Sequence, residues 1–110
     1  MAHPSKRKGD RFELDVVDAL RRAGIEGAER ALGAGRRDDR GDIFGIPGMV
    51  LQAKNVARMD LPGWMRDAAR QAGNDRTDLY AVVHKRHGVA DAAQAWVTMP
   101  LHVFARWVQQ

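Results

Sequence analysis

Residues 41–55 read GDIFGIPGMVLQAKN, two short apolar runs joined by a Pro-Gly turn. Apolar runs bounded by turn residues are typical of a hairpin, and strands are predicted over 42–46 and 49–54. Three polar side chains interrupt this stretch, namely Asp42, Gln52 and Lys54. A buried charge without a partner is costly, so these groups must be compensated by one another, by water or by a metal ion.

Residues two apart in a strand point to the same face, so Gln52 and Lys54 share a side. Pairing of the two strands brings Asp42 near Gln52 at one end of the hairpin. Two interpretations remain open from these residues alone. In one, Asp42 and Lys54 form a salt bridge while Gln52 hydrogen-bonds the backbone; in the other, the polar groups form a site.

The chain before this hairpin begins with a basic arm over residues 1–8, followed by apolar residues at helical spacing that predict a helix over 8–23. Residues 29–32 are a weak strand candidate. The charged segment 33–41, GAGRRDDRG, is predicted to be a loop.

After the hairpin, Asp60 is placed to cap a helix that ends near Gly73. Residues 78–85 and 95–99 are apolar strand candidates, and a final helix is predicted from Pro100. Its inner face is expected to carry Leu101, Phe104, Ala105 and Val108. Core positions, some of which could instead cover an interface, are expected at Trp64, Met65, Tyr80, Trp96, Phe104 and Trp107.

The element order is thus α-β-β-β-α-β-β-α, which predicts an α/β fold with a central mixed β-sheet flanked by helices. No repeat or linker divides the chain, so residues 1–110 are expected to form one domain.

The charge balance indicates a polyanionic partner. Eighteen Lys plus Arg against fourteen Asp plus Glu give a net charge of +4, and fourteen of the cations are Arg. Because the planar guanidinium suits phosphate, nucleic acid is the first partner to consider. No cysteine, signal-peptide pattern or long apolar run is present, which favours a cytoplasmic protein without disulfides, thiolate metal sites or a membrane span. The four His show no zinc-ligand spacing.

Glu13 adds a carboxylate at the border of the buried face of the first predicted helix, from which it can reach over the sheet. Three motifs in chain order, Lys8-Gly9-x-x-x-Glu13, Gly41-Asp42-Ile43 and Gln52-Ala53-Lys54, then resemble the PD-(D/E)xK nuclease superfamily. More narrowly, the chain is similar to the archaeal-type Holliday junction resolvases. The likeness covers most of the chain, because the first helix, three strands, long helix and next strand follow the family's order.

This resemblance implies a restriction-endonuclease-like fold and a divalent-metal-dependent endodeoxyribonuclease that cuts four-way junctions as a two-fold homodimer. It implies Mg²⁺, with Mn²⁺ as a substitute, held by Asp42, Glu13, the side-chain oxygen of Gln52 and the backbone carbonyl of Ala53. Lys54 would orient or help deprotonate the attacking water and stabilise the transition state. No small-molecule cofactor is implied.

The sequence departs from the family pattern at two positions. Gln52 stands where most members have Glu or Asp, which removes one negative charge and is expected to weaken metal binding. Gly41 stands where Pro usually precedes the acid. The first change favours a one-metal mechanism or dependence on the more tightly held Mn²⁺.

Cations around these motifs are the expected DNA contacts. They fall in three groups along the sequence: Lys6, Arg7, Lys8 and Arg11; Arg36, Arg37 and Arg40; Lys85 and Arg86 between His84 and His87. Arg66 and Arg70 on the second predicted helix could touch phosphate or be solvated. Two other functions stay open: a nuclease of the same fold acting on flaps, nicks or mismatched duplex, and a DNA-binding module with weak or no cleavage.

Overall fold

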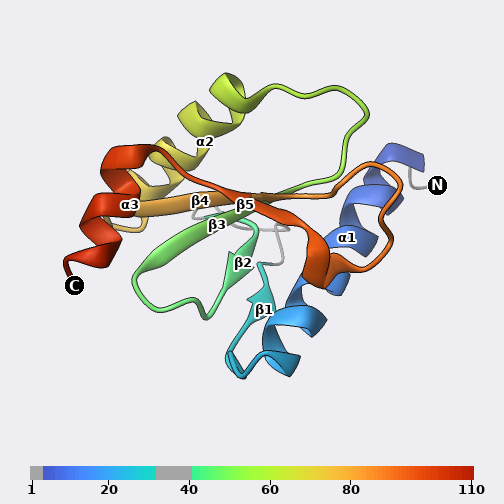
Figure 1. The fold of residues 1–110 in the computed structure, drawn as a ribbon, viewed down its shortest axis with the longest axis horizontal. Coiled ribbons are helices and arrows are strands. Elements are labelled where there is room, and N and C mark those ends of the chain that lie inside the picture. Colours follow the sequence, from blue (N-terminus) through green and yellow to red (C-terminus); the bar gives the residue numbers. More distant parts are fainter. Residues whose placement is uncertain (1–3, 32–40) are drawn as a thin grey trace.

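The computed structural model describes residues 4–31 and 41–110, drawn as a ribbon in Figure 1. The described helices and strands, in chain order, are α1 (Pro4–Arg22), β1 (Glu29–Arg30), β2 (Ile43–Phe44), β3 (Met49–Lys54), α2 (Leu61–Asn74), β4 (Leu79–His84), the 3₁₀ turn η1 (Ala92–Gln94), β5 (Trp96–Thr98) and α3 (Leu101–Val108). The predicted α-β-β-β-α-β-β-α order and the α/β class are confirmed.

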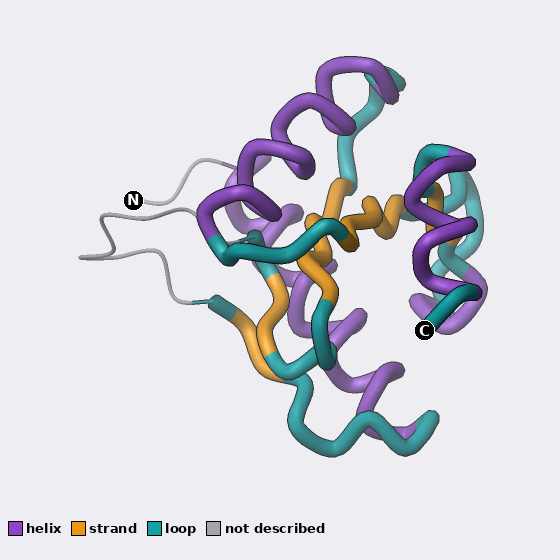
Figure 2. Tube along the Cα trace, turned by 90° about the vertical axis from the view of Figure 1, so that its left-hand side faces the viewer, coloured by secondary structure: helices purple, strands orange, loops and turns teal. Residues whose placement is uncertain are grey.

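The strands form one mixed sheet in the order β1-β2-β3-β4-β5. Among the described strands, only β3 and β4 pair in parallel, while the other neighbours are antiparallel. A parallel pair needs a crossover connection, and α2 provides it between β3 and β4. Figure 2 shows strands running between helices, with the C-terminal helix standing apart from the others.

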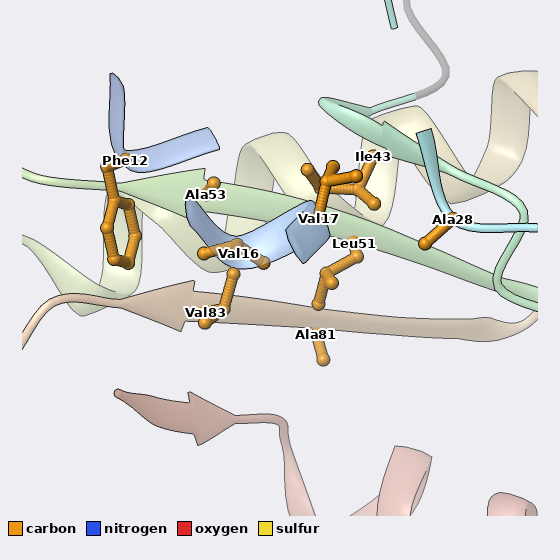
Figure 3. Close-up of a cluster of buried hydrophobic side chains, with 9 residues drawn as sticks. All are labelled: Phe12, Val16, Val17, Ala28, Ile43, Leu51, Ala53, Ala81 and Val83. Carbon is orange, nitrogen blue, oxygen red and sulfur yellow. The ribbon is translucent and has the colours of Figure 1, made fainter. Parts of the chain in front are cut away.

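One face of the sheet is covered by α1. Phe12, Val16 and Val17 of this helix pack against strand residues of the same face, including Leu51 and Ala53 of β3 (Figure 3). All five of these residues are buried. The spacing of the helix residues puts them on one stripe, and burial of each large side chain contributes about 1.5–3 kcal/mol. This cluster is the larger core and fixes α1 over β3.

The opposite face of the sheet is covered by α2, where Trp64 and Ala68 pack on Val82 of β4. Asp60 caps α2, since its carboxylate accepts the Gly63 amide at 3.1 Å, and Pro62 lies in the first turn as expected. Helix α3 lies beside this face, because its His102 ring contacts Tyr80 of β4. The sheet is therefore layered between α1 on one side and α2 with α3 on the other.

Two features differ from the sequence predictions. The first helix begins at Pro4, so Lys6, Arg7 and Lys8 stand on its first turns rather than on an extended arm. Proline is tolerated there because the first amides of a helix have no intrahelical acceptor.

The predicted inner face of the last helix is wrong. Val103 is its buried residue, 1 % exposed, whereas Leu101 is 81 % and Val108 62 % exposed. Phe104, Ala105, Trp107 and the strand residue Trp96 are also exposed, while Trp64 is buried as expected and Met65 and Tyr80 are half-buried. An apolar helical stripe requires a partner surface, and residues 4–31 and 41–110 offer none to this one.

No helix among the described residues is long and apolar enough to cross a membrane.

Candidate active site at the end of β2

Asp42 lies where the pairing of β2 with β3 ends. Ile43 is the residue opposite Leu51, so the next step along the antiparallel register brings Asp42 level with Gln52. The Asp42 amide donates to the Leu51 carbonyl at 3.0 Å, and Asp42 Oδ2 accepts the Ala53 amide at 2.8 Å. The Asp42 carboxylate thus accepts the Ala53 amide in the position that a paired strand would otherwise take, and it lies against the Gln52-Ala53 peptide.

Gly41 explains why a glycine precedes this acid. Its φ is +102°, and a Cβ there would lie 2.9 Å from Val50 Cγ1 and 3.2 Å from the Leu51 carbonyl oxygen. Proline, with φ fixed near −65°, cannot adopt this conformation. The departure from the family pattern therefore reflects a different local path of the backbone into Asp42.

Glu13 approaches from α1, on the other side of the sheet edge. Its side chain is 19 % exposed, and its Oε1 accepts Arg30 Nε at 2.9 Å. Burial raises the pKa of Glu13, the Arg30 hydrogen bond opposes that rise, and the negative charge of Asp42 adds to it. The effect of Asp42 on the pKa of Glu13 is thus smaller than the effects of burial and of Arg30.

Arg30 is a site residue that the sequence reasoning missed. From β1 it donates to Glu13 and, through Nη2, to Asp10 at 2.8 Å. The signal for this role in the sequence is the charge of Arg30 within a short strand candidate. A charged side chain on a strand needs a partner of opposite charge, and Asp10 and Glu13 of the neighbouring helix provide it. Lys6 also contacts Asp10, at 3.0 Å, and these two cations lower the pKa of that carboxyl, Lys6 more than Arg30.

Gln52 and Lys54 point to the face covered by α2, since Leu51 and Ala53 between and beside them pack under α1. Gln52 is 4 % exposed, and its Oε1 has no hydrogen-bond partner among the described residues. An unsatisfied buried carbonyl costs about 1–3 kcal/mol. A buried carbonyl oxygen without a hydrogen-bond donor is available to bind a cation.

The predicted site residues are therefore arranged around one edge of β3. Glu13 lies on the α1 side, Gln52 and Lys54 on the α2 side, and Asp42 at the edge between them, beside the Ala53 amide. Among the described residues no group of three or more His, Asp or Glu side chains is placed to hold a metal ion. A metal site here must use the Gln52 amide oxygen or a backbone carbonyl beside the two acids, and such oxygen donors match Mg²⁺.

The predicted DNA-binding cations are distributed unevenly. Lys6 pairs with Asp10, and Arg11 pairs with Asp15 at 3.2 Å, both on the exposed side of α1. Arg7 is exposed on the same helix. Arg36, Arg37 and Arg40 lie outside the described residues.

Lys8, Lys85 and Arg86 meet across the chain. They line one pocket of about 160 Å³ at the ends of β3 and β4, together with Asn55 and His87. Within the part of the chain that the structure describes, no acidic residue lines this pocket. The first turns of α1 and the end of β4, predicted separately as DNA contacts, therefore form one basic surface.

Comparison of the chain with protein-family models, with curated protein sequences and with solved structures gives no match. Function must therefore be argued from the residues and their arrangement.

Proposed function

We propose that this chain is a divalent-metal-dependent endodeoxyribonuclease of the restriction-endonuclease-like type, and that its substrate is branched DNA of the kind a Holliday junction resolvase cuts. One observation carries the proposal. The Asp42 carboxylate lies against the Ala53 amide, one residue from a buried Gln52 oxygen that has no partner among the described residues. An acid and an orphaned acceptor at one strand edge are an incomplete set of hard oxygen ligands.

The donor set fits Mg²⁺ or Mn²⁺, with Asp42, Glu13, Gln52 Oε1 and the Ala53 carbonyl as candidate ligands. A bound divalent cation supplies a lowered pKa for a coordinated water and neutralises charge on the phosphate. Burial contributes most to the raised pKa of Glu13, and the negative charge of Asp42 adds to it, so a cation between the two carboxylates would be favoured. Lys54, on the α2 side of the same strand, would orient the water and stabilise the developing negative charge.

A second candidate, a DNA-binding module with weak or no cleavage, is favoured by one contact. Arg30 already neutralises Glu13 at 2.9 Å, and Gln52 contributes no charge. Both features reduce the demand of the site for a cation. Binding through the basic surface of Lys8, Lys85 and Arg86 would remain, because phosphate contacts need no metal.

The deciding experiment offers a labelled four-way junction, a flap and a linear duplex to the protein with Mg²⁺ or Mn²⁺. Symmetric cuts at the junction support a resolvase, cuts in the other DNAs support a nuclease of different preference, and tight binding without cuts supports the binding module. Asp42→Asn and Lys54→Ala should abolish cleavage and keep most binding in EDTA. Asp67→Asn, an exposed acid on α2, is the matched control and should cleave normally. If both site variants lose binding, the salt-bridge interpretation of Asp42 and Lys54 stands instead.

We further propose that two copies associate through the exposed apolar face of α3. The junction-cutting role requires two copies, because both symmetric strands must be cut. Leu101, Trp107 and Val108 are 81 %, 48 % and 62 % exposed on a helix of eight residues. Exposed apolar side chains gathered on one short helix are typical of an interaction surface. A two-fold axis beside α3 would present two copies of the site to one symmetric substrate.

A further inference from the structure

A second pocket lies on the α2 side of the sheet, next to Lys54. In the strand registers Lys54 pairs with His84, and His84 with Trp96, so these three residues form a row across β3, β4 and β5. Neighbouring strands are about 4.8 Å apart, and residues paired in register share a face. The row therefore places His84 and Trp96 on the same face as Gln52 and Lys54.

We call the cavity over this row the His84 pocket, lined among others by Met59, Trp64, His84, Arg86 and Trp96. Its volume is about 360 Å³. Volumes of about 300 Å³ and more are typical of sites for small organic groups. It shares Lys85, Arg86 and His87 with the smaller basic pocket to which Lys8 contributes, so the two cavities adjoin.

The walls of the His84 pocket are aromatic. Trp64 is 8 % exposed and its ring lies 5.7 Å from that of His84, whereas Trp96 is 54 % exposed. The guanidinium of Arg86 lies 4.3 Å from the centre of the Trp96 ring. This cation–π contact stacks the two planar groups on each other in the wall of the pocket, and the Trp96 side chain remains about half exposed.

The pocket also has one polar group in its wall and positive charge at its rim. His84 is 5 % exposed, and its Nε2 lies 2.7 Å from Thr98 Oγ1, which fixes the ring in the wall. Lys85, Arg86 and His87 supply the rim, and the described residues that line the two cavities include no acid. Aromatic planes beside cations are the combination by which proteins hold unpaired bases together with their phosphates.

We propose that the His84 pocket receives one unpaired nucleobase of the DNA substrate, while Lys8, Lys85 and Arg86 hold the flanking phosphates. The inference rests on the proposed function only for the identity of the polymer. It names what the pocket recognises: a base released from the stack, as at a branch point or a single-nucleotide bulge. Fully paired duplex would contact the basic rim alone.

The test uses two duplexes with identical backbones, one with a single bulged adenosine and one with an abasic nucleotide in its place. Binding is measured by fluorescence anisotropy in EDTA, which prevents metal-dependent cleavage. The wild type should bind the bulged base about 5- to 150-fold more tightly than the abasic bulge, the range expected for stacking of one base. Trp96→Ala should reduce this ratio to near one, and Trp96→Phe should restore most of it.

Matched controls separate stacking from charge. Val97→Ala, 59 % exposed on the opposite face of β5 from Trp96, should leave the base-to-abasic ratio unchanged. Arg86→Ala should lower both the ratio and overall affinity, whereas Arg22→Ala, an exposed arginine of α1, should change neither. A wild-type ratio near one, or a ratio that Trp96→Ala leaves intact, overturns the pocket assignment while junction cleavage can still stand. Failure to bind either duplex, or any junction, overturns the pocket assignment and the proposed function together.

Discussion

Replacement of Gln52 by Met tests whether the buried amide is kept for ligand binding at the expense of stability. Gln52 is 4 % exposed, and its Oε1 has no hydrogen-bond partner among the described residues. Methionine has a similar length and volume and no carbonyl, so Gln52→Met removes the unsatisfied acceptor without a cavity. Because such an acceptor costs about 1–3 kcal/mol, the metal-free variant should be more stable by about that amount.

The assay is urea unfolding followed by tryptophan fluorescence, in EDTA and in millimolar Mn²⁺. At a urea m-value of about 1–3 kcal/mol/M, a gain of about 1–3 kcal/mol moves the midpoint upward by several tenths of a molar or more. Wild type should also gain stability in Mn²⁺ as a ligand of the folded state, whereas Gln52→Met should gain much less. A Gln52→Met protein less stable than wild type in EDTA would refute the reasoning, because it would mean that the amide oxygen is satisfied in the folded chain.

Three further outcomes are expected. Gly41→Ala should destabilise the fold by about 1–3 kcal/mol and reduce cleavage, since a Cβ at φ +102° meets Val50. The control is Gly73→Ala, in a helix with open space around this residue, which should stabilise the fold by up to about 1 kcal/mol. Equal urea midpoints for the two variants would contradict this. Burial lowers the pKa of His84 below its ordinary 6.5, so the unfolded chain binds the proton more readily than the folded chain. The contribution of His84 to stability is therefore full above pH 6.5. As the pH falls below 6.5, the free energy of unfolding should decrease by at most about 1.4 kcal/mol per pH unit. His84→Gln should flatten that slope between pH 5 and 7, and a parallel slope in the variant would exclude His84 as its source. Leu101→Glu should convert the dimer to a monomer without lowering the unfolding midpoint of the monomer. The oligomeric state is measured by light scattering after gel filtration. A wild type that is monomeric at high concentration would contradict the proposed α3 interface.

The hairpin could be predicted from the sequence because turn chemistry and apolar pattern agree there. The Pro-Gly turn separates two runs, and the observed strands β2 and β3 lie within the predicted ranges 42–46 and 49–54. Register follows from burial: once Leu51 and Ala53 face α1, Gln52 and Lys54 must face away. The placement of Asp42 level with Gln52 is a consequence of that register rather than of any motif.

The last helix could not be predicted in the same way. Its apolar spacing predicts a stripe that faces the core, but Val103 is the one residue of α3 that is buried. Periodicity indicates that a helix has an apolar face and does not indicate that the same chain covers it. The role of Arg30 was hidden for a related reason, since the contact with Glu13 joins residues seventeen apart through the packing of β1 against α1.

The end of β2 is the position where both sides of the sheet can act on one ligand. Beneath α1 and α2 the two faces of β3 are separated by the strand itself, so Glu13 and Gln52 could not share a cation across its middle. Beyond Ile43 no strand among the described residues pairs with this edge of β3, and the Asp42 carboxylate accepts the Ala53 amide there. Extension of β2 by two paired residues would cover this edge and separate the acid of α1 from the polar face of β3. The β2 strand is short, since it begins at Ile43, two residues after the positive φ of Gly41. On this argument the proposed cation would lie at the end of β2, and Lys54, paired with His84, would lie between it and the His84 pocket.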